Sequence, residues 1–126
     1  MAASYTYDER ARLIRATAGP ELTFAEYLAL RRSVEADPRI PTGAAVLFDL
    51  RNVTHLSITG AEVISIAQGK ESVERRARRI AVVVKDPVGF GLTRVYDLAR
   101  GYGPPLQVFR EIETALEWVL EGSAPP

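Results

Sequence analysis

Two apolar runs with the character of buried β-strands dominate the middle of the chain. Residues 44–50 read AAVLFDL, and residues 78–87 read RRIAVVVKDP. Short apolar runs that end at polar or proline residues are typical of strands covered on both faces of a sheet. The residues between them carry apolar side chains at helical spacing, among them Val63, Ile64 and Ala67. Strand, helix and strand in this order predict a right-handed βαβ unit with parallel strands, and therefore a domain of the α/β class.

The segment before this unit is predicted to hold two strands and a helix. Residues 4–16 read as a pair of short strands. Thr23, followed three residues later by Glu26, has the form of a capping box and predicts a helix over residues 24–35. Pro38 is the expected stop signal for this helix.

Helix, strand and helix follow the βαβ unit. Residues 92–99 place apolar side chains at helical spacing, and residues 105–109 form a short strand near an edge of the sheet. Residues 110–122 follow the helical apolar period without a miss. The predicted order is therefore ββαβαβαβα in a single domain over residues 1–126, whose last residues, 122–126, form a frayed tail.

The composition excludes several classes of function. The chain has 16 basic and 16 acidic residues, so no overall field draws it to nucleic acid or to an anionic membrane. It has no cysteine and one histidine, His55, which excludes thiol chemistry and a metal site rich in cysteine or histidine. No apolar run approaches the length of a membrane span, and the N-terminus lacks the apolar stretch of a signal peptide. We therefore expect a cytoplasmic protein without a metal or another cofactor.

A glycine-rich stretch stands between a predicted strand and a predicted helix, where nucleotide-binding proteins carry their phosphate loop. It consists of Gly89, Phe90 and Gly91. The third glycine of a dinucleotide fingerprint is replaced by Arg94, so the simpler interpretation is a tight turn into the helix. The alternative is that the free N–H groups at this helix start, together with Arg94, hold a small anion or ligand.

Asp49, His55 and Ser57 are the three residue types of a hydrolase triad. The sequence lacks the strained nucleophile turn that such enzymes use, so the simpler interpretation of His55 is an exposed loop residue or a polar contact at the edge of the sheet. A hydrolase that uses these three residues is the enzymatic hypothesis.

Two further groups of residues have a structural and a functional interpretation. A basic cluster indicates either an exposed helix end or a weak contact with an acidic partner; it comprises Lys70, Arg75, Arg76, Arg78 and Arg79. Three aromatic residues indicate either packing or, if they lie together, a dimer face or the mouth of an apolar ligand site; they are Phe90, Tyr102 and Trp118.

Three blocks of the sequence resemble a known family. They are residues 47–63 (LFDLRNVTHLSITGAEV), 79–97 (RIAVVVKDPVGFGLTRVYD) and 107–119 (QVFREIETALEWV). Over residues 44–121 the chain resembles the small bacterial SpoIIAA-like proteins with a STAS-like domain, which are related to the anti-sigma-factor antagonists. It is most similar to their single-domain branch, sometimes grouped with CRAL-TRIO lipid-binding domains. The resemblance implies a mixed, mostly parallel five-stranded sheet flanked by about four helices, and a regulatory or binding module rather than an enzyme.

In the antagonists, an anti-sigma kinase phosphorylates a serine within the local pattern Asp-Ser-Ser-Gly. Aligned on the preceding strand, this pattern falls on Ser57-Ile58-Thr59-Gly60. Thr59 retains a hydroxyl side chain at the position of the second serine, and Gly60 retains the glycine. The resemblance therefore marks Thr59, with Ser57 and Gly60 beside it, as a phospho-acceptor or partner surface. The residues themselves offer another interpretation, because Thr59 followed by Glu62 has the form of a capping box.

Three functions are compatible with these observations. The first is a non-catalytic regulatory module that binds a protein partner or a second copy of itself around Ser57, Thr59 and Phe90, and is switched at Thr59. The second is a carrier or sensor of a small apolar or acyl ligand, or of an anion at the helix N-termini, and an apolar ligand requires a cavity. An enzyme that uses Asp49, His55 and Ser57 is the third, and we expect no enzymatic activity.

Overall fold

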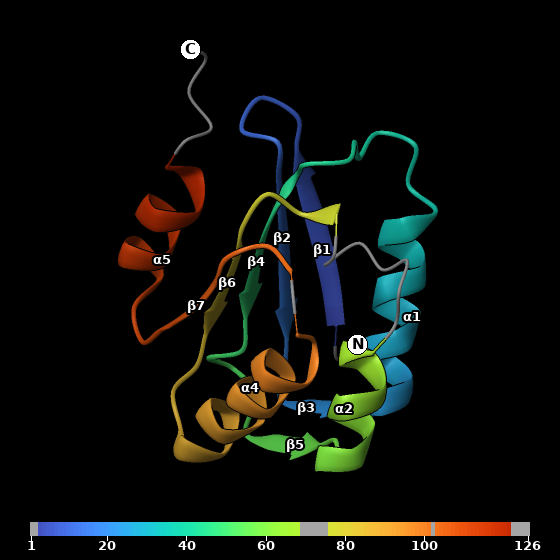
Figure 1. Cartoon of the computed structure of the whole chain (residues 1–126), viewed down its shortest axis with the longest axis vertical. Helices are drawn as coiled ribbons and strands as arrows, with labels where there is room; N and C mark the ends of the chain where they lie inside the picture. The colour runs from blue at the N-terminus through green and yellow to red at the C-terminus, as the bar shows by residue number, and fades with distance from the viewer. Residues whose placement is uncertain (1–2, 69–75, 102, 122–126) are drawn as a thin grey trace.

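A sheet of mainly parallel strands forms the centre of the molecule (Figure 1). The computed structural model describes residues 3–68, 76–101 and 103–121. The main sheet consists of β1 (Ala3–Asp8), β2 (Leu13–Ala18), β4 (Ala45–Asp49), β6 (Ile80–Val83) and β7 (Leu106–Phe109). A second, smaller sheet pairs β3 (Glu21–Thr23) with β5 (His55–Ser57). The described helices are α1 (Phe24–Glu35), α2 (Gly60–Ala67), α4 (Pro87–Ala99) and α5 (Ile112–Leu120).

Four of the five strands in the main sheet run parallel. The strand order is β1-β2-β4-β6-β7, and β1 is antiparallel to β2 while every other neighbouring pair is parallel. The two strands of the predicted βαβ unit, β4 and β6, are adjacent, and β7 lies at an edge. Over the residues that the structure describes, it therefore confirms the predicted mixed, mostly parallel five-stranded sheet flanked by about four helices.

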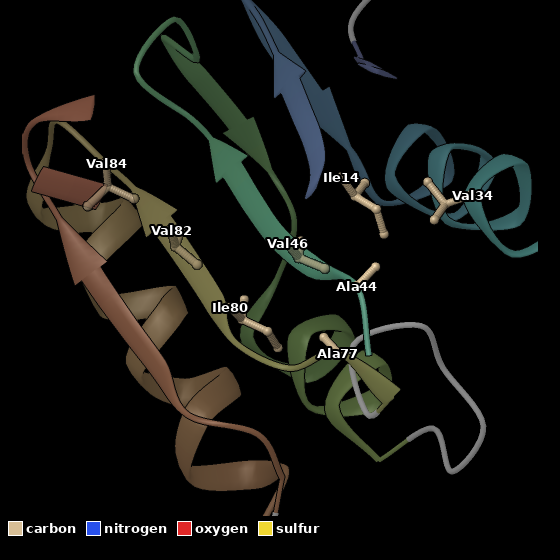
Figure 2. Packing of buried hydrophobic residues seen from close by; sticks show 8 residues of the cluster. All are labelled: Ile14, Val34, Ala44, Val46, Ala77, Ile80, Val82 and Val84. Carbon is tan, nitrogen blue, oxygen red and sulfur yellow. The ribbon is translucent and has the colours of Figure 1, made fainter. Parts of the chain in front are cut away.

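Helices cover the two faces of this sheet unequally. α5 lies against one face, where its Ala115 and Val119 pack on Val83 of β6. The other helices lie on the opposite side of the sheet (Figure 1). Figure 2 shows the packing on that side, where Val34 of α1 faces Ile14 of β2. Both faces of the central strands are therefore buried, as their continuous apolar runs predict.

The small sheet of β3 and β5 is not predicted by the sequence. Its strands pair over three residues each. The Pro20 carbonyl accepts hydrogen bonds from the N–H groups of Thr54 at 2.7 Å and His55 at 3.1 Å. Gly19 has a φ of +139°, and a Cβ there would lie 2.5 Å from the backbone oxygen of Asn52, so this turn requires glycine. Strands this short carry too few residues for an alternating pattern to be recognised.

Helix α4 begins earlier than the sequence pattern indicates. Asp86 is its N-cap, and the Asp86 carboxylate accepts a hydrogen bond from the Gly89 N–H at 2.8 Å. Gly89 and Gly91 therefore lie inside the helix, and the predicted glycine loop before it is wrong. Two glycines lower the helix propensity of this segment, but the aspartate cap and Pro87 in the first turn favour a helix start here.

Other predicted elements have boundaries close to those expected. The capping box of Thr23 and Glu26 is present, and α1 occupies the predicted residues. The helix predicted after β4 is described as far as Ala67. Its continuation through residues 69–75, the residue Tyr102 and the predicted tail lie outside the described residues.

Candidate functional site

An apolar cavity lies between the main sheet and helices α1, α2 and α4. Its volume is about 140 Å³. Strand residues form one wall: Ile14, Ala16, Val46, Phe48, Ile80 and Val82. Helix residues form the opposite wall: Leu30, Val34, Val63, Ile66, Leu92 and Tyr96. Protein cores contain few voids larger than a water molecule, so a cavity of this size is the first candidate for a ligand site.

Small residues on two elements help to leave this space open. Ala16 stands beside Phe48 in the register of β2 and β4, and both residues line the cavity. Gly89 lines it from α4, where a Cβ would lie 3.2 Å from the Val84 side chain. The first turn of helix α4 is therefore packed closely against Val84, the residue that follows β6.

The chain segment that leads into α2 forms part of the cavity wall. Leu56 and Ile58 line the cavity, whereas His55, Ser57 and Thr59 are exposed to solvent. Such alternation is the side-chain pattern of an extended strand. One short segment therefore connects the inside of the cavity with the surface that the sequence marks as a partner site.

Thr59 is the N-cap of α2. Its hydroxyl oxygen accepts a hydrogen bond from the Glu62 N–H at 3.1 Å, and its own N–H donates to the Glu62 carboxylate at 2.9 Å. This confirms the predicted capping box. The Ser57 hydroxyl lies 3.4 Å from the Glu21 carboxylate, and a Cβ at Gly60 would meet no atom within 4 Å. Ser57, Thr59 and Gly60 thus stand together at an open helix start.

The second predicted site lies within α4. Gly89 is buried, Phe90 is half-buried, and Gly91 and Arg94 are exposed. The Gly89 N–H that could hold an anion already donates to the Asp86 carboxylate. Because a negative charge occupies this helix start, the arrangement does not favour a small anion there.

Asp49, His55 and Ser57 do not form a catalytic arrangement. Asp49 is buried, and its carboxylate accepts hydrogen bonds from Nε and Nη2 of Arg51 at 2.9 and 2.8 Å. These bonds hold the pKa of Asp49 below its usual value, so the carboxylate stays charged and paired with Arg51. Among the hydrogen bonds of the described residues, none joins Asp49, His55 and Ser57 to one another.

Two of the basic residues have a structural role. Arg78 donates to the Val119 carbonyl at 3.0 Å, and Arg79 donates to the Trp118 carbonyl at 2.6 Å. Both therefore satisfy carbonyl groups at the end of α5, and the interpretation of this pair as a solvated helix end is wrong. Trp118 packs on the α5 side of the sheet and Phe90 on the other side, so these two aromatic residues do not share a surface.

Sequence reasoning missed the residues of the cavity, and among them a charged one. Arg31 lines the cavity, and its side chain is 14% exposed. It stands four residues after Tyr27 and three before Val34, which is the spacing of one helix face. That spacing is the pattern from which its position could have been predicted. Thr93 is buried at the cavity, and its hydroxyl donates to the Gly89 carbonyl at 2.8 Å.

The described part of the chain holds neither a cluster of metal ligands nor a helix suited to a bilayer. No group of three histidine, aspartate or glutamate side chains there could hold a metal ion. Among the helices described, none combines the length and the apolar character that a bilayer crossing requires. The cavity is thus the site with the most defined geometry.

Comparison with known proteins supports the architecture. No protein-family model matches the sequence, and no curated protein shows significant similarity to it. The structure is similar to the crystal structure of an uncharacterised protein of the DUF3478 family, with a SpoIIAA-like fold, from Shewanella loihica PV-4. The two share 19% sequence identity with a TM-score of 0.61, and the similarity covers 94% of each chain. The chain therefore has a SpoIIAA-like fold, as its sequence resemblance implies.

Proposed function

We propose that this protein is a non-catalytic binding module that holds a small apolar or acyl ligand between the main sheet and helices α1, α2 and α4. The observation that carries the proposal is the cavity of about 140 Å³ with its apolar lining. A ligand that fills this space would make dispersion contacts with the apolar lining that the side chains alone leave unmade.

The cavity volume indicates the size of the ligand. A dry apolar cavity of roughly 150 Å³ is large enough to bind benzene. The cavity here, at about 140 Å³, therefore fits a single ring or a short acyl chain. Its residues provide apolar contact for the body of such a ligand rather than a set of polar groups for a sugar or a nucleotide.

Titration with toluene, followed by amide NMR spectra, tests the proposal. We expect shift changes at residues that line the cavity and a dissociation constant raised by about tenfold or more in an Ala16→Leu variant, because the added side chain occupies the cavity. The matched control is Ala25→Leu, which makes the same change at an exposed position of α1. Absence of toluene binding in the wild type, or equal binding in Ala16→Leu, would contradict the proposal.

A second candidate function is regulation of a protein partner or of self-association through the surface of Ser57, Thr59 and Gly60. The observation that favours it is the alternation along this segment, in which Leu56 and Ile58 face the cavity. A ligand that displaces the two inner side chains also shifts the exposed residues between them. The domain would then act as a sensor whose occupancy is read at its surface.

Phosphorylation of Thr59 would act on the same surface. A phosphate there would stand at the positive end of the α2 dipole, but the Thr59 hydroxyl is 3.2 Å from the Glu62 carboxylate. Modification would therefore break the capping box and change the start of α2.

Native mass spectrometry tests whether ligand binding and a negative charge at Thr59 each change the association of the protein. The samples are wild type, Thr59→Glu and the exposed control Thr42→Glu, each with and without toluene. We expect toluene and Thr59→Glu to change the dimer fraction or the co-purified partner; an unchanged pattern in all samples would argue against this second function.

A further inference from the structure

The cavity wall offers few groups to which a polar ligand could bind. Among the described residues that line it, those with a nitrogen or oxygen atom in the side chain are Tyr27, Arg31, Thr93 and Tyr96. The other lining residues carry hydrocarbon side chains or, at Gly89, none. The bonds that the polar side chains already make within the protein therefore decide whether a ligand finds a polar partner here.

The hydroxyl of Thr93 is used within its own helix. Thr93 is buried, and its hydroxyl donates to the Gly89 carbonyl, one turn earlier in α4, at 2.8 Å. A hydroxyl has a single hydrogen to donate, so in this arrangement Thr93 has none left for a ligand.

The remaining polar side chains of the wall interact with protein groups. The Arg31 Nε lies 3.7 Å from the Glu35 carboxylate, which balances the arginine charge. The Tyr27 ring stacks on Phe48, and Tyr96 also interacts with other groups of the protein. No buried side-chain nitrogen or oxygen atom of the described lining residues is without a hydrogen-bond partner. The described lining therefore holds no buried polar atom that a ligand is needed to satisfy.

The backbone of the central strands is paired as well. Strand β2 pairs with β1 and β4, and β6 pairs with β4 and β7, so their N–H and C=O groups bond to neighbouring strands. A hydroxyl or carboxylate placed against this wall would lose its hydrogen bonds to water without replacing them. Such a transfer is unfavourable for a hydroxyl and far more so for an ionised carboxylate.

We propose that the part of the ligand enclosed by the cavity is an uncharged hydrocarbon group, and that the cavity selects against an alcohol or a carboxylate of the same size. This inference rests on the ligand-binding function proposed above and narrows its ligand class from apolar or acyl compounds to hydrocarbons. The volume of about 140 Å³ limits the enclosed group to about one ring or a short chain.

Amide NMR and calorimetric titrations of the full chain with toluene, phenol and benzoate test the inference. Toluene and phenol have nearly the same size and differ by a methyl against a hydroxyl group. We expect wild-type protein to bind toluene at least about tenfold more tightly than phenol, and benzoate more weakly still, because the polar groups leave water without gaining a partner. Shift changes at residues that line the cavity show where each ligand binds.

Two variants remove the wall groups that could contact a polar ligand. Thr93→Val removes the hydroxyl whose oxygen could accept a bond from phenol, and Arg31→Gln removes the charge that could hold benzoate. We expect both variants to bind toluene as wild type does, which also shows that they are folded, and to keep the tenfold preference over phenol. Thr42→Val and Arg32→Gln make the same changes at exposed positions and are the matched controls.

The possible results separate this inference from the function on which it rests. If toluene binds and phenol or benzoate binds as tightly, the hydrocarbon assignment is overturned and the binding function stands. Weaker phenol binding in Thr93→Val, or weaker benzoate binding in Arg31→Gln, with unchanged toluene binding, overturns it as well, because the wall then supplies a polar contact. If none of the three compounds binds to the wild type, both the function and the inference are wrong.

Discussion

Tyr27 of α1 stacks on Phe48 of β4, with ring centroids 6.0 Å apart and ring planes inclined by 9°. Both residues line the cavity. Offset stacking between two aromatic rings is favourable beyond the apolar area that it buries. The stacked pair therefore stabilises the packing of α1 on the sheet at the cavity wall. We infer that the two rings set the distance between α1 and the sheet at this point.

A double-mutant cycle with Tyr27→Leu and Phe48→Leu measures this stacking. We expect each single variant to lower the free energy of unfolding and the pair to show a coupling of about 1 kcal/mol, because leucine keeps apolar volume but cannot stack. Urea denaturation gives the free energy of unfolding of the wild type, the two single variants and the double variant. Additivity of the two substitutions within about 0.3 kcal/mol would show that the contact contributes nothing specific.

Two glycines of α4 should respond oppositely to the same substitution. Gly91→Ala should raise the free energy of unfolding by about 1 kcal/mol, because alanine favours a helix and a Cβ there meets no atom within 4 Å. Gly89→Ala should lower it by about 1 kcal/mol, because the new Cβ would press on the buried Val84 at 3.2 Å. Chemical denaturation of both variants checks the contrast. Equal stabilisation by both would mean that Val84 yields without cost.

The capping role of Thr59 can be separated from any regulatory role. Thr59→Ala should lower the free energy of unfolding by about 1 kcal/mol, because the Glu62 N–H loses its acceptor at the start of α2. Thr59→Ser should keep most of the stability, since its hydroxyl can accept the same bond. Thr42→Ala, at an exposed position outside any helix, is the control for thermal unfolding. A Thr59→Ala variant as stable as wild type would indicate that the residue is retained for another reason.

Asp37 should make the protein sensitive to acid. Arg39 and Tyr5 donate hydrogen bonds to its carboxylate at 2.7 and 2.8 Å, and the bonds from Arg39 chiefly hold the pKa of Asp37 well below its usual range. The charged form therefore stabilises the fold at pH values above about 3.9, the pKa of an unfolded aspartate, and this stabilisation is lost as the pH falls from there toward the folded pKa.

Melting temperatures measured across the acid range check this sign. We expect Asp37→Asn to melt below wild type at pH 7 and the difference to shrink as the pH is lowered through about 4. Tyr5→Phe removes one of the donors and should show a smaller difference of the same direction. A difference that stays constant down to pH 2 would contradict the assignment.

Local patterns were sufficient for several elements of the fold. The capping box of Thr23 and Glu26 marks the start of α1, and that of Thr59 and Glu62 marks the start of α2. These contacts join residues three positions apart, so the sequence itself contains both partners. The apolar runs of β4 and β6 likewise predict strands buried on both faces. Successive side chains of a strand point to opposite faces of the sheet, so a continuous apolar run makes both faces apolar.

The start of α4 shows where a local interpretation fails. Glycine at positions 89 and 91 is unfavourable in a helix, and the sequence alone therefore predicts a loop. In the structure the helix begins at Pro87, directly after its N-cap Asp86, and Gly89 packs so closely on Val84 that a Cβ would lie 3.2 Å from the Val84 side chain. Val84, which limits the space for a side chain at position 89, directly follows strand β6. Helix propensity gives no information about this contact.

The sequence by itself determined the class of the domain, the order of its main strands and helices, and the capping role of Thr59. Only the tertiary structure decided that a cavity of about 140 Å³ remains inside and that Arg31 stands in its wall. A cavity is the volume left over when side chains from several elements pack together, so it belongs to no segment. The sequence shows Arg31 and Arg32 as two adjacent like charges, and the packing of α1 on the sheet turns one to the cavity and the other to solvent.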